Sequence, residues 1–431
     1  MADNQAILKV SMADESTFAA VDSTTGQPDW SGLTFAEIEF ESAELVVQPL
    51  QEDRAPTRCS TAEAPPQAGD WRNSSGTPYQ IRRGVLTLKV AVDNVGSSGL
   101  AVTDLTSYKL ARTLLLDDPP PSASSVITTG VSTTRITPAG AADWEYGALV
   151  AVSYNGRQVT TRCTGVDAGD KILSPALPTT PANGSTARFF HQLFAKSTWS
   201  TTSKAFRLDG QGLRWYALGC QASDITWETS KTGVIYQTVT LQVAQCDPDH
   251  GNGDPTCDGQ GVSGLVRPNV LNCYHSMSTQ WAGQGGALVE PAESPRLAVQ
   301  VEGWKVTLSV PATPDECTDN AIGMIGWRRA GGITGTVDIP MCTAEASAFA
   351  ADRSNKARRQ LHLNAGPHAA NNGFCLAFGG VWHRADPYIR ERGPDIWRQK
   401  LSLGIGDYSG DTDSGAPAAS ADAYMIVGWG R

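Results

Sequence analysis

The same order of short sequence patterns occurs twice along the 431 residues of this chain. Each occurrence has an apolar run that ends in glycine, a polar segment, an isoleucine beside an aromatic residue, and a closing alternation of apolar and polar residues. The two stretches are LRWYALGCQASDITWETSKTGVIYQTVTLQVAQ, which contains Gly219, and GFCLAFGGVWHRADPYIRERGPDIWRQKLSLGIGD, which contains Gly379 and Gly380. Self-similarity of this kind predicts a duplicated structural unit.

Two further matches precede these stretches in the same order. IRRGVLTLKVAV, which follows Gln80, resembles WRRAGGITGTVDI, which starts at Trp327. Before them, IEFESAELVV resembles VEGWKVTLSV. A short helix is predicted after the first pair in each copy, from Thr103 and from Thr343, because a hydroxyl side chain can cap a helix start. Three matches in one order favour a duplicated domain with extra material inside the first copy.

The dominant local pattern has a period of two, which is typical of β-strands with one buried face. In FAEIEFESAELVV the apolar Ile38 and Phe40 alternate with Glu37, Glu39 and Glu41, so one face is apolar and the other acidic. GVLTLKVAV, VIYQTVTLQVAQ, KVTLSV, TGTVDI and KLSLGI follow the same rule. The sequence therefore predicts a mainly β protein with a few short helices.

Two local signals stand out among these strands. Asn155-Gly156 lies between two extended runs and predicts a tight β-hairpin. STARFFHQLFAK, from Ser185, has aromatic and apolar residues four apart, which predicts a helix with an aromatic face. The pairs are Phe190 with Phe194 and Phe189 with Leu193.

Long stretches rich in Pro, Gly and Ser divide the chain, and they suggest domain limits. We predict an N-terminal arm over 1–34, a first domain over 35–245, a linker over 246–295 and a second domain over 296–431. An insert is expected inside the first domain at about 117–143. Loops longer than about 15 residues are uncommon in compact domains and usually have a function, which applies here to 51–79.

Composition excludes several classes of protein. The formal net charge is −10, which argues against a basic nucleic-acid-binding protein. The sequence has no apolar run long enough to span a membrane, and the N-terminus lacks the pattern of a signal peptide. The nine cysteines are expected to be mostly reduced core thiols in a cytosolic setting.

The order of these elements resembles that of the tail tube proteins of long-tailed bacteriophages. The second copy carries the resemblance best, through VEGWKVTLSV, the loop PATPDECTDNAIGM, WRRAGGITGTVDI, TAEASAFAADR, GFCLAFGGV and WRQKLSLGIG. The resemblance implies two tandem tail-tube-like β-sandwich or partial-barrel domains, whose sheets continue into neighbouring subunits. It also implies that loops 51–79 and 311–326 reach the adjoining ring.

From this resemblance we expect a structural virion protein without catalytic residues or cofactor. It would assemble with itself into stacked rings, trimeric for a two-domain chain, and would conduct DNA without binding it specifically. The implied protein partners are the tape measure, tail terminator and distal tail proteins. The implied location is the tail of the virion, after assembly in the host cytoplasm, with no membrane contact.

Two sets of side chains are candidates for roles in such a tube. A lumen that carries DNA should repel phosphate, so Glu37, Glu39 and Glu41 are candidate lumen-facing residues. An ordinary solvated strand face is the alternative. The arginines Arg82, Arg83, Arg328 and Arg329 are candidates for inter-subunit ion pairs, because the sequence matches place them at equivalent positions. Surface charges that contribute little energy are the alternative.

Three other interpretations are open at this stage. A distal-tail or adaptor protein can share the domain and caps the tube without polymerising. The sequence GDTDSGAPAAS around Ser414 resembles the nucleophile segment of chymotrypsin-like peptidases, but no histidine lies in the setting that such enzymes need. The cysteines, histidines and aspartates of 246–275 are zinc or calcium ligand types without a recognised spacing, so a plain loop is favoured.

Overall fold

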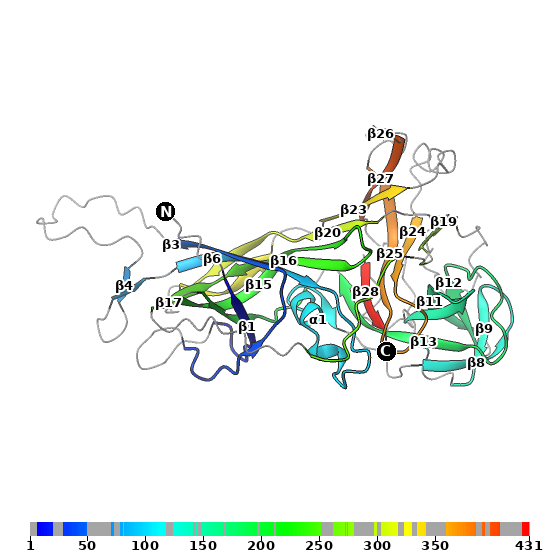
Figure 1. The fold of residues 1–431 in the computed structure, drawn as a ribbon, viewed down its shortest axis with the longest axis horizontal. Helices are drawn as coiled ribbons and strands as arrows, with labels where there is room; N and C mark the ends of the chain where they lie inside the picture. The colour runs from blue at the N-terminus through cyan, green and yellow to red at the C-terminus, as the bar shows by residue number, and fades with distance from the viewer. Residues whose placement is uncertain are drawn as a thin grey trace, which may run out of the picture.

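The computed structural model describes most of the chain in segments. They are residues 7–19, 29–49, 70–72, 78–80, 82–117, 124–140, 144, 148–167, 169–195, 199–210, 213–250, 262–271, 273, 275–279, 297–299, 303–317, 323–329, 334–341, 359–384, 390–392, 397–405 and 425–430. The protein is mainly β (Figure 1), as predicted. No helix in the described segments is long and apolar enough to cross a membrane.

The first half of the chain, up to residue 250, builds a branched antiparallel sheet. Its strands are β1 (Lys9–Asp14), β2 (Ala36–Glu37), β3 (Ser42–Pro49), β6 (Arg82–Ala91), β14 (Lys204–Asp209), β15 (Leu213–Thr229), β16 (Ile235–Val243) and β17 (Gln245–His250). The pairings run β3-β6-β16-β15, and β15 continues on to β17 and through β14 and β1 to β2. A separate hairpin of β4 (Asp70–Arg72) and β5 (Pro78–Gln80) interrupts the link from β3 to β6.

The second half, from residue 275, repeats this topology. Its strands are β18 (His275–Thr279), β19 (Leu297–Val299), β20 (Lys305–Ser309), β21 (Ala312–Glu316), β22 (Met324–Arg329), β23 (Thr334–Met341), β24 (Arg359–Ala365), β25 (Phe374–His383), β26 (Arg390–Arg392), β27 (Trp397–Ile405) and β28 (Met425–Gly430). The pairings run β20-β23-β27-β25, and β25 continues to β28 and through β24 and β18 to β19. A hairpin, β21–β22, again interrupts the link from β20 to β23.

The two halves also share a local irregularity, which fixes the alignment between them. Lys204 pairs with Cys220 and Phe206 with Ala217, so the ladder of β14 and β15 shifts by one residue. The ladder of β24 and β25 shifts in the same place, between the pairs Arg359–Val381 and Leu361–Phe378. When the two halves are aligned at this shift, Gly219 corresponds to Gly380. The strand pairings in each half then make Val46 of β3 correspond to Thr307 of β20.

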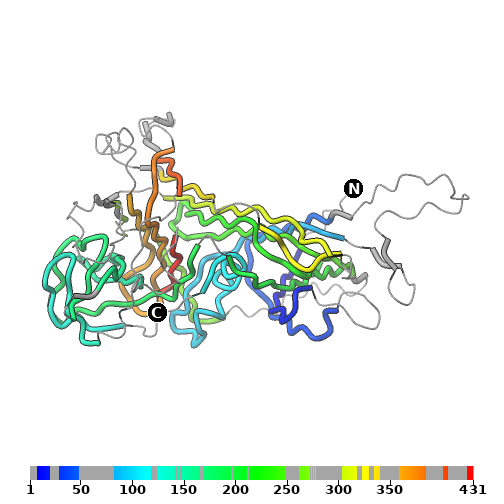
Figure 2. The backbone as a smooth tube through the Cα atoms, turned by 180° about the vertical axis from the view of Figure 1, so that it is seen from behind, coloured from blue at the N-terminus to red at the C-terminus, as the bar shows by residue number. Residues whose placement is uncertain are grey.

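The halves form a continuous sheet where β20 pairs with β15, seen in Figure 2 as the yellow trace beside the green one, and β28 of the second half also pairs with β13 (Thr186–Ala195), a strand of the inserted barrel. β20 lies antiparallel along the C-terminal part of β15, with Thr226 opposite Thr307 and Glu228 opposite Lys305. The two threonine hydroxyls are 3.1 Å apart and share a hydrogen bond. Buried Ile225, Val306 and Leu308 cover the opposite face of the same junction. Part of the predicted linker 246–295 belongs to the sheets, since this range includes most of β17 and all of β18.

A six-stranded closed barrel is inserted in the first half, between the helix and β14. The strands of this region are β7 (Leu116–Asp117), β8 (Ser124–Gly130), β9 (Arg135–Pro138), β10 (Leu149–Tyr154), β11 (Arg157–Asp167), β12 (Asp170–Ser174) and β13 (Thr186–Ala195). The barrel closes in the order β8-β9-β12-β11-β10-β13. It has its own apolar core around Trp144 and Phe189. The expected insert at 117–143 is thus only the first part of a larger unit.

The helices are few, as expected. η1 (Val102–Asp104) and α1 (Thr106–Ala111) occupy the stretch where a helix was predicted from Thr103. The helix predicted from Ser185 is wrong, because these residues form β13. Its aromatic side chains are buried on both faces, since β13 closes the barrel at one end and pairs with β28 at the other. The helix predicted from Thr343 lies outside the described residues.

The sequence also predicted a hairpin, an N-terminal arm and two long loops. Asn155 and Gly156 form the turn between β10 and β11, with φ of 49° and 74°, so the hairpin prediction is confirmed. The expected N-terminal arm is wrong in part, because β1 is a buried strand that pairs with β14. The predicted loops 51–79 and 311–326 overlap the hairpins β4–β5 and β21–β22, which end at Gln80 and Arg329.

Candidate assembly site at the edge of the shared sheet

The eight-strand run β3-β6-β16-β15-β20-β23-β27-β25 has one apolar face and one polar face. On the apolar face, Leu88, Val239, Leu308 and Val337 are fully buried. The polar face is rich in threonine and is half-buried to exposed. Its members include Thr87, Lys89, Thr238, Thr240, Asp224, Thr226, Glu228, Lys305, Thr307, Thr336, Asp338 and Ser402. The strand period of two explains this division, because alternate side chains point to opposite faces.

Charges on the polar face lie next to charges of opposite sign. Lys89 Nζ is 2.6 Å from Glu228 Oε1. Lys305 stands opposite Glu228 on one neighbouring strand and opposite Asp338 on the other. Alternation along β16 places Thr238 and Thr240 on the polar face and Gln237 on the opposite one. In the structure Gln237 is buried on the apolar side, where its Oε1 accepts a hydrogen bond from Trp227 Nε1.

β3 is the open edge of this sheet. Among the described residues it pairs with β6 alone, whereas its counterpart β20 pairs with both β23 and β15. β3 is eight residues long, has proline only at its last position, and exposes Val46 to 44%. Such an unprotected edge presents free backbone donors and acceptors to another strand.

Other described edges of the sheets are short or protected against pairing. β2 has two residues and β19 has three. β17 has Pro248 between Asp247 and Asp249, and proline cannot donate to a ladder. The corresponding strand β28 has Val427 between Ile426 and Gly428, and it pairs on its outer side with β13.

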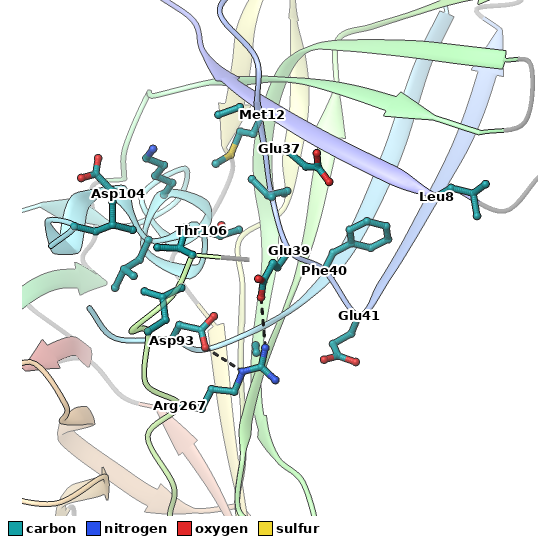
Figure 3. Close-up of a pocket in the computed structure, with 18 residues that line it drawn as sticks. Leu8, Met12, Glu37, Glu39, Phe40, Glu41, Asp93, Asp104, Thr106 and Arg267 are labelled. Carbon is teal, nitrogen blue, oxygen red and sulfur yellow. Dashed lines mark hydrogen bonds and ion pairs between the residues drawn. The ribbon is translucent and has the colours of Figure 1, made fainter. Parts of the chain in front are cut away.

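The candidate lumen residues line a hollow beside the first half (Figure 3). Glu37, Glu39 and Glu41 are all exposed and Ile38 between them is buried, so the predicted alternation of exposure is confirmed. A single strand through this stretch is wrong, because β2 ends at Glu37 and β3 begins at Ser42. Their lumen role stays a prediction.

Ion pairs hold two of these glutamates, Glu37 and Glu39, against the fold. Glu37 Oε2 is 3.3 Å from Lys9 Nζ. Arg267 joins Glu39, at 3.5 Å, to Asp93, at 3.2 Å. Burial raises the pKa of Asp93, although the Arg267 cation beside it acts in the opposite direction.

The candidate inter-subunit arginines do not occupy equivalent positions. Arg82 and Arg83 begin β6, whereas Arg328 and Arg329 end β22, so that part of the prediction is wrong. Local similarity of the two Arg-Arg pairs misled the alignment, because the hairpins before them differ in length. Any contact that these arginines make with a second chain stays a prediction.

Within the chain, the described contacts of these arginines are as follows. Gln245 Oε1 accepts a hydrogen bond from the Arg82 backbone N–H at 3.2 Å, Arg83 is 3.6 Å from Glu316, and Arg328 is 2.8 Å from Asp315. Arg329 is 7% exposed and donates to Gln221 Oε1 at 3.5 Å. Burial lowers the pKa of Arg329 to about 10.

The chemical alternatives gain no site in the described part of the chain. Ser414 lies outside the described residues. Of the proposed metal ligands, Cys246 and His275 are buried in different halves and Cys273 is half-buried. No group of three or more potential metal ligands occurs among the residues that the structure describes.

Sequence reasoning missed one signal that links the halves. β1 and β18 both contain a Ser-Met pair, and the ladders align Ser11-Met12 with Ser276-Met277. Both methionines are buried. A two-residue similarity is too short to stand out before the strands around it are known.

Comparisons with known proteins add no identification. No protein-family model matches the chain, and no curated protein matches it.

Proposed function

We propose that this protein is a structural virion component that assembles with itself into stacked rings, which form the tube of a phage tail and conduct DNA. The proposal rests on the sequence resemblance and on one structural observation. β3 and β20 occupy corresponding positions in the two halves. Among the described residues, β20 pairs with β15 on its outer side, whereas β3 pairs with no strand besides β6. A second copy of the chain is the natural source of the strand that β3 lacks.

The joint between subunits would copy the joint inside the chain. β20 pairs with the C-terminal part of β15. In the sequence of the second half, the residues that follow β25 correspond to this part of β15. Contact of β3 with that part of a second chain is head-to-tail, and such contacts close into a ring when the rotation between copies is right. The eight-strand run then continues from chain to chain without an open edge.

The polar face of the run suits the inside of a conduit. Its threonines offer neutral hydroxyl groups, and its lysines already face carboxylates. Phosphate contacts to unpaired cations would hold DNA in place, so paired cations favour passage. We therefore assign the lumen to this threonine-rich face, beside the prediction already made for the three glutamates.

The test is assembly of the purified chain, measured by sedimentation velocity and negative-stain electron microscopy across a concentration series. Val46→Lys places a charge at the middle of β3, at the position of Thr307 in the internal joint. We expect rings or tubes for the wild type and single chains for this variant. A matched control, Val131→Lys, changes a similarly exposed valine (48%) on the barrel and should assemble normally.

Three outcomes decide the proposal. Rings that stack into tubes support it, and equal thermal midpoints of both variants exclude misfolding as the reason for lost assembly. Rings that never stack favour the adaptor alternative. A wild-type chain that stays single at every concentration contradicts both.

A further inference from the structure

The strands β17 and β28 occupy corresponding positions in the two halves, but their outer sides differ. β28 pairs with β25 on one side and, over its whole length, with β13 of the barrel on the other (Figure 1). All six residues of β28 are buried. Among the described residues, β17 pairs only with β15. The barrel is inserted in the sequence of the first half, yet it covers a strand of the second half.

The sequences of the two strands differ in the way that this difference in cover requires. When the halves are aligned at their shared ladder shift, Val427 of β28 corresponds to Pro248 of β17. Aspartates flank Pro248 in the sequence, whereas Val427 lies between Ile426 and Gly428. Proline and charged residues are common means by which an edge strand avoids pairing with other chains. The sequence of β17 therefore includes its own protection, and the sequence of β28 includes none.

The backbone of β28 offers hydrogen-bonding groups on the side that β13 covers. The Gly430 N–H donates to the carbonyl oxygen of Gly373, which directly precedes β25, at 2.6 Å. Because bonding groups alternate along a strand, the Val427 N–H points to the other side, where Leu193 of β13 lies opposite. Pro248, at the corresponding position of β17, has no N–H to offer there. Without β13, the edge of β28 would be open to another strand.

Side chains of the barrel also cover one face of β28. Leu149 of β10 belongs to a small apolar core that includes Ile426 of β28 and Cys375 of β25. The barrel approaches Gly428 so closely that an added Cβ would lie 2.9 Å from side-chain atoms of Leu149 and Phe190. The barrel and β28 therefore fit each other at the edge and at this face.

Polar contacts fix the barrel to the neighbouring strand β24 as well. The Thr160 hydroxyl of β11 donates to Asn364 Oδ1 at 2.9 Å and lies 2.9 Å from His362 Nδ1. Gln360 Nε2 donates to Ser174 Oγ of β12 at 2.8 Å. All five residues are buried. Paired polar groups in a buried contact favour one fixed placement of the barrel, because each group that lost its partner would be costly.

We propose that the inserted barrel is a cover for β28, which prevents a second copy of this chain from pairing along that edge. A closed barrel suits this task, because it pairs one of its strands with β28 and has no open edge of its own. The inference rests on the proposed function in one respect: it leaves β3 as the edge through which copies join. Without the cover, the β28 edges of two copies would be free to pair with each other.

The first measurement opens the edge in a chain that carries Val46→Lys, so that pairing through β3 is blocked. Leu193→Pro removes the N–H that β13 offers to β28 opposite Val427. We expect faster hydrogen exchange of the Val427 amide and an apparent mass in sedimentation velocity that rises about twofold or more. A freely exchanging Val427 amide in chains that stay single would overturn the inference. An amide that stays protected would also contradict it, since β13 would then not be the cover.

The second measurement separates an open edge from a damaged barrel. Val427→Pro is added to the same chain and gives β28 the residue that β17 has at this position. The barrel carries the same Leu193→Pro change as before, but the edge now lacks the N–H that a second strand would need. We expect the apparent mass to return to that of a single chain. Self-association that persists would show that β28 is not the surface responsible.

A matched control keeps the backbone bond and removes only the side chain. Leu193→Ala, also combined with Val46→Lys, retains the N–H that pairs with β28, so these chains should stay single. Self-association as strong as that of Leu193→Pro would assign the effect to lost core packing and contradict the inference. The comparison uses chains with β3 blocked throughout, so its result does not depend on whether the wild type forms rings. Absence of rings in the wild type would contradict the proposed function and leave the role of the barrel standing.

Discussion

His275 should make the stability of this protein depend on pH in a defined direction. The side chain lies in β18, is 4% exposed, and accepts a hydrogen bond on Nδ1 from the backbone N–H of Asn364 at 3.2 Å. A backbone amide can only donate, so Nδ1 must keep its lone pair and the ring must be neutral. Burial also lowers the pKa of His275 from its ordinary 6.5 to about 4.

The sign and size follow from linkage between protonation and folding. The unfolded chain binds the proton more tightly than the folded chain, so this contribution is fully present above about pH 6.5 and is lost as pH falls toward 4. A shift of about 2.5 units at about 1.4 kcal/mol per unit gives roughly 3 kcal/mol of unfolding free energy. Protonation should loosen β18 from β24, because the hydrogen bond that it breaks comes from Asn364, which lies in β24, the strand that β18 pairs with.

The assay compares the wild type with His275→Val, which carries the residue that the ladders align with this position, Val10. Urea denaturation is measured near pH 7.5 and near pH 4.5, and the wild type should lose about 3 kcal/mol more than the variant between them. The variant lacks the Asn364–His275 hydrogen bond at both pH values, so the cost of losing it cancels. NMR of the His275 ring should show titration near pH 4.

Equal pH dependence in the two proteins would refute this reasoning. A ring that titrates at its ordinary pKa of 6.5 in the folded protein would do the same.

Three further predictions concern stability, measured by urea denaturation. Tyr108→Phe removes a hydroxyl 2.9 Å from His191 Nε2 in a buried site and should lower the unfolding free energy by about 1–3 kcal/mol; a change below the measurement error would show that the hydroxyl is not needed. Leu308→Ala opens a cavity at the junction of the halves and should destabilise by about 2–5 kcal/mol, so a smaller loss would mean that the junction repacks. Gly219→Ala should destabilise by at least about 1 kcal/mol, because Gly219 has φ of 63° and an added Cβ would lie 2.7 Å from the Ala244 Cβ; an unchanged midpoint would contradict the strain argument.

The sequence determined the local elements and their repetition. Period-two alternation placed β6 and β16, and Asn155-Gly156 placed a hairpin, because strand alternation and turn conformation depend on neighbouring residues alone. The order of the repeated sequence patterns agrees with the order of the corresponding strands in the two halves. The alignment of Arg82-Arg83 with Arg328-Arg329 was wrong, because it matched two short identical sequences and did not allow for the different lengths of the hairpins before them.

Only the tertiary structure decided which strands meet. Phe190 and Phe194 stand four apart, which suits a helix, but β28 and the barrel bury both faces of this segment and make it a strand. The junction of β15 with β20 joins residues about 80 positions apart, such as Thr226 and Thr307, which no local pattern records. Pairing between distant strands is a property of the folded sheet, and it is this pairing that leaves β3 open.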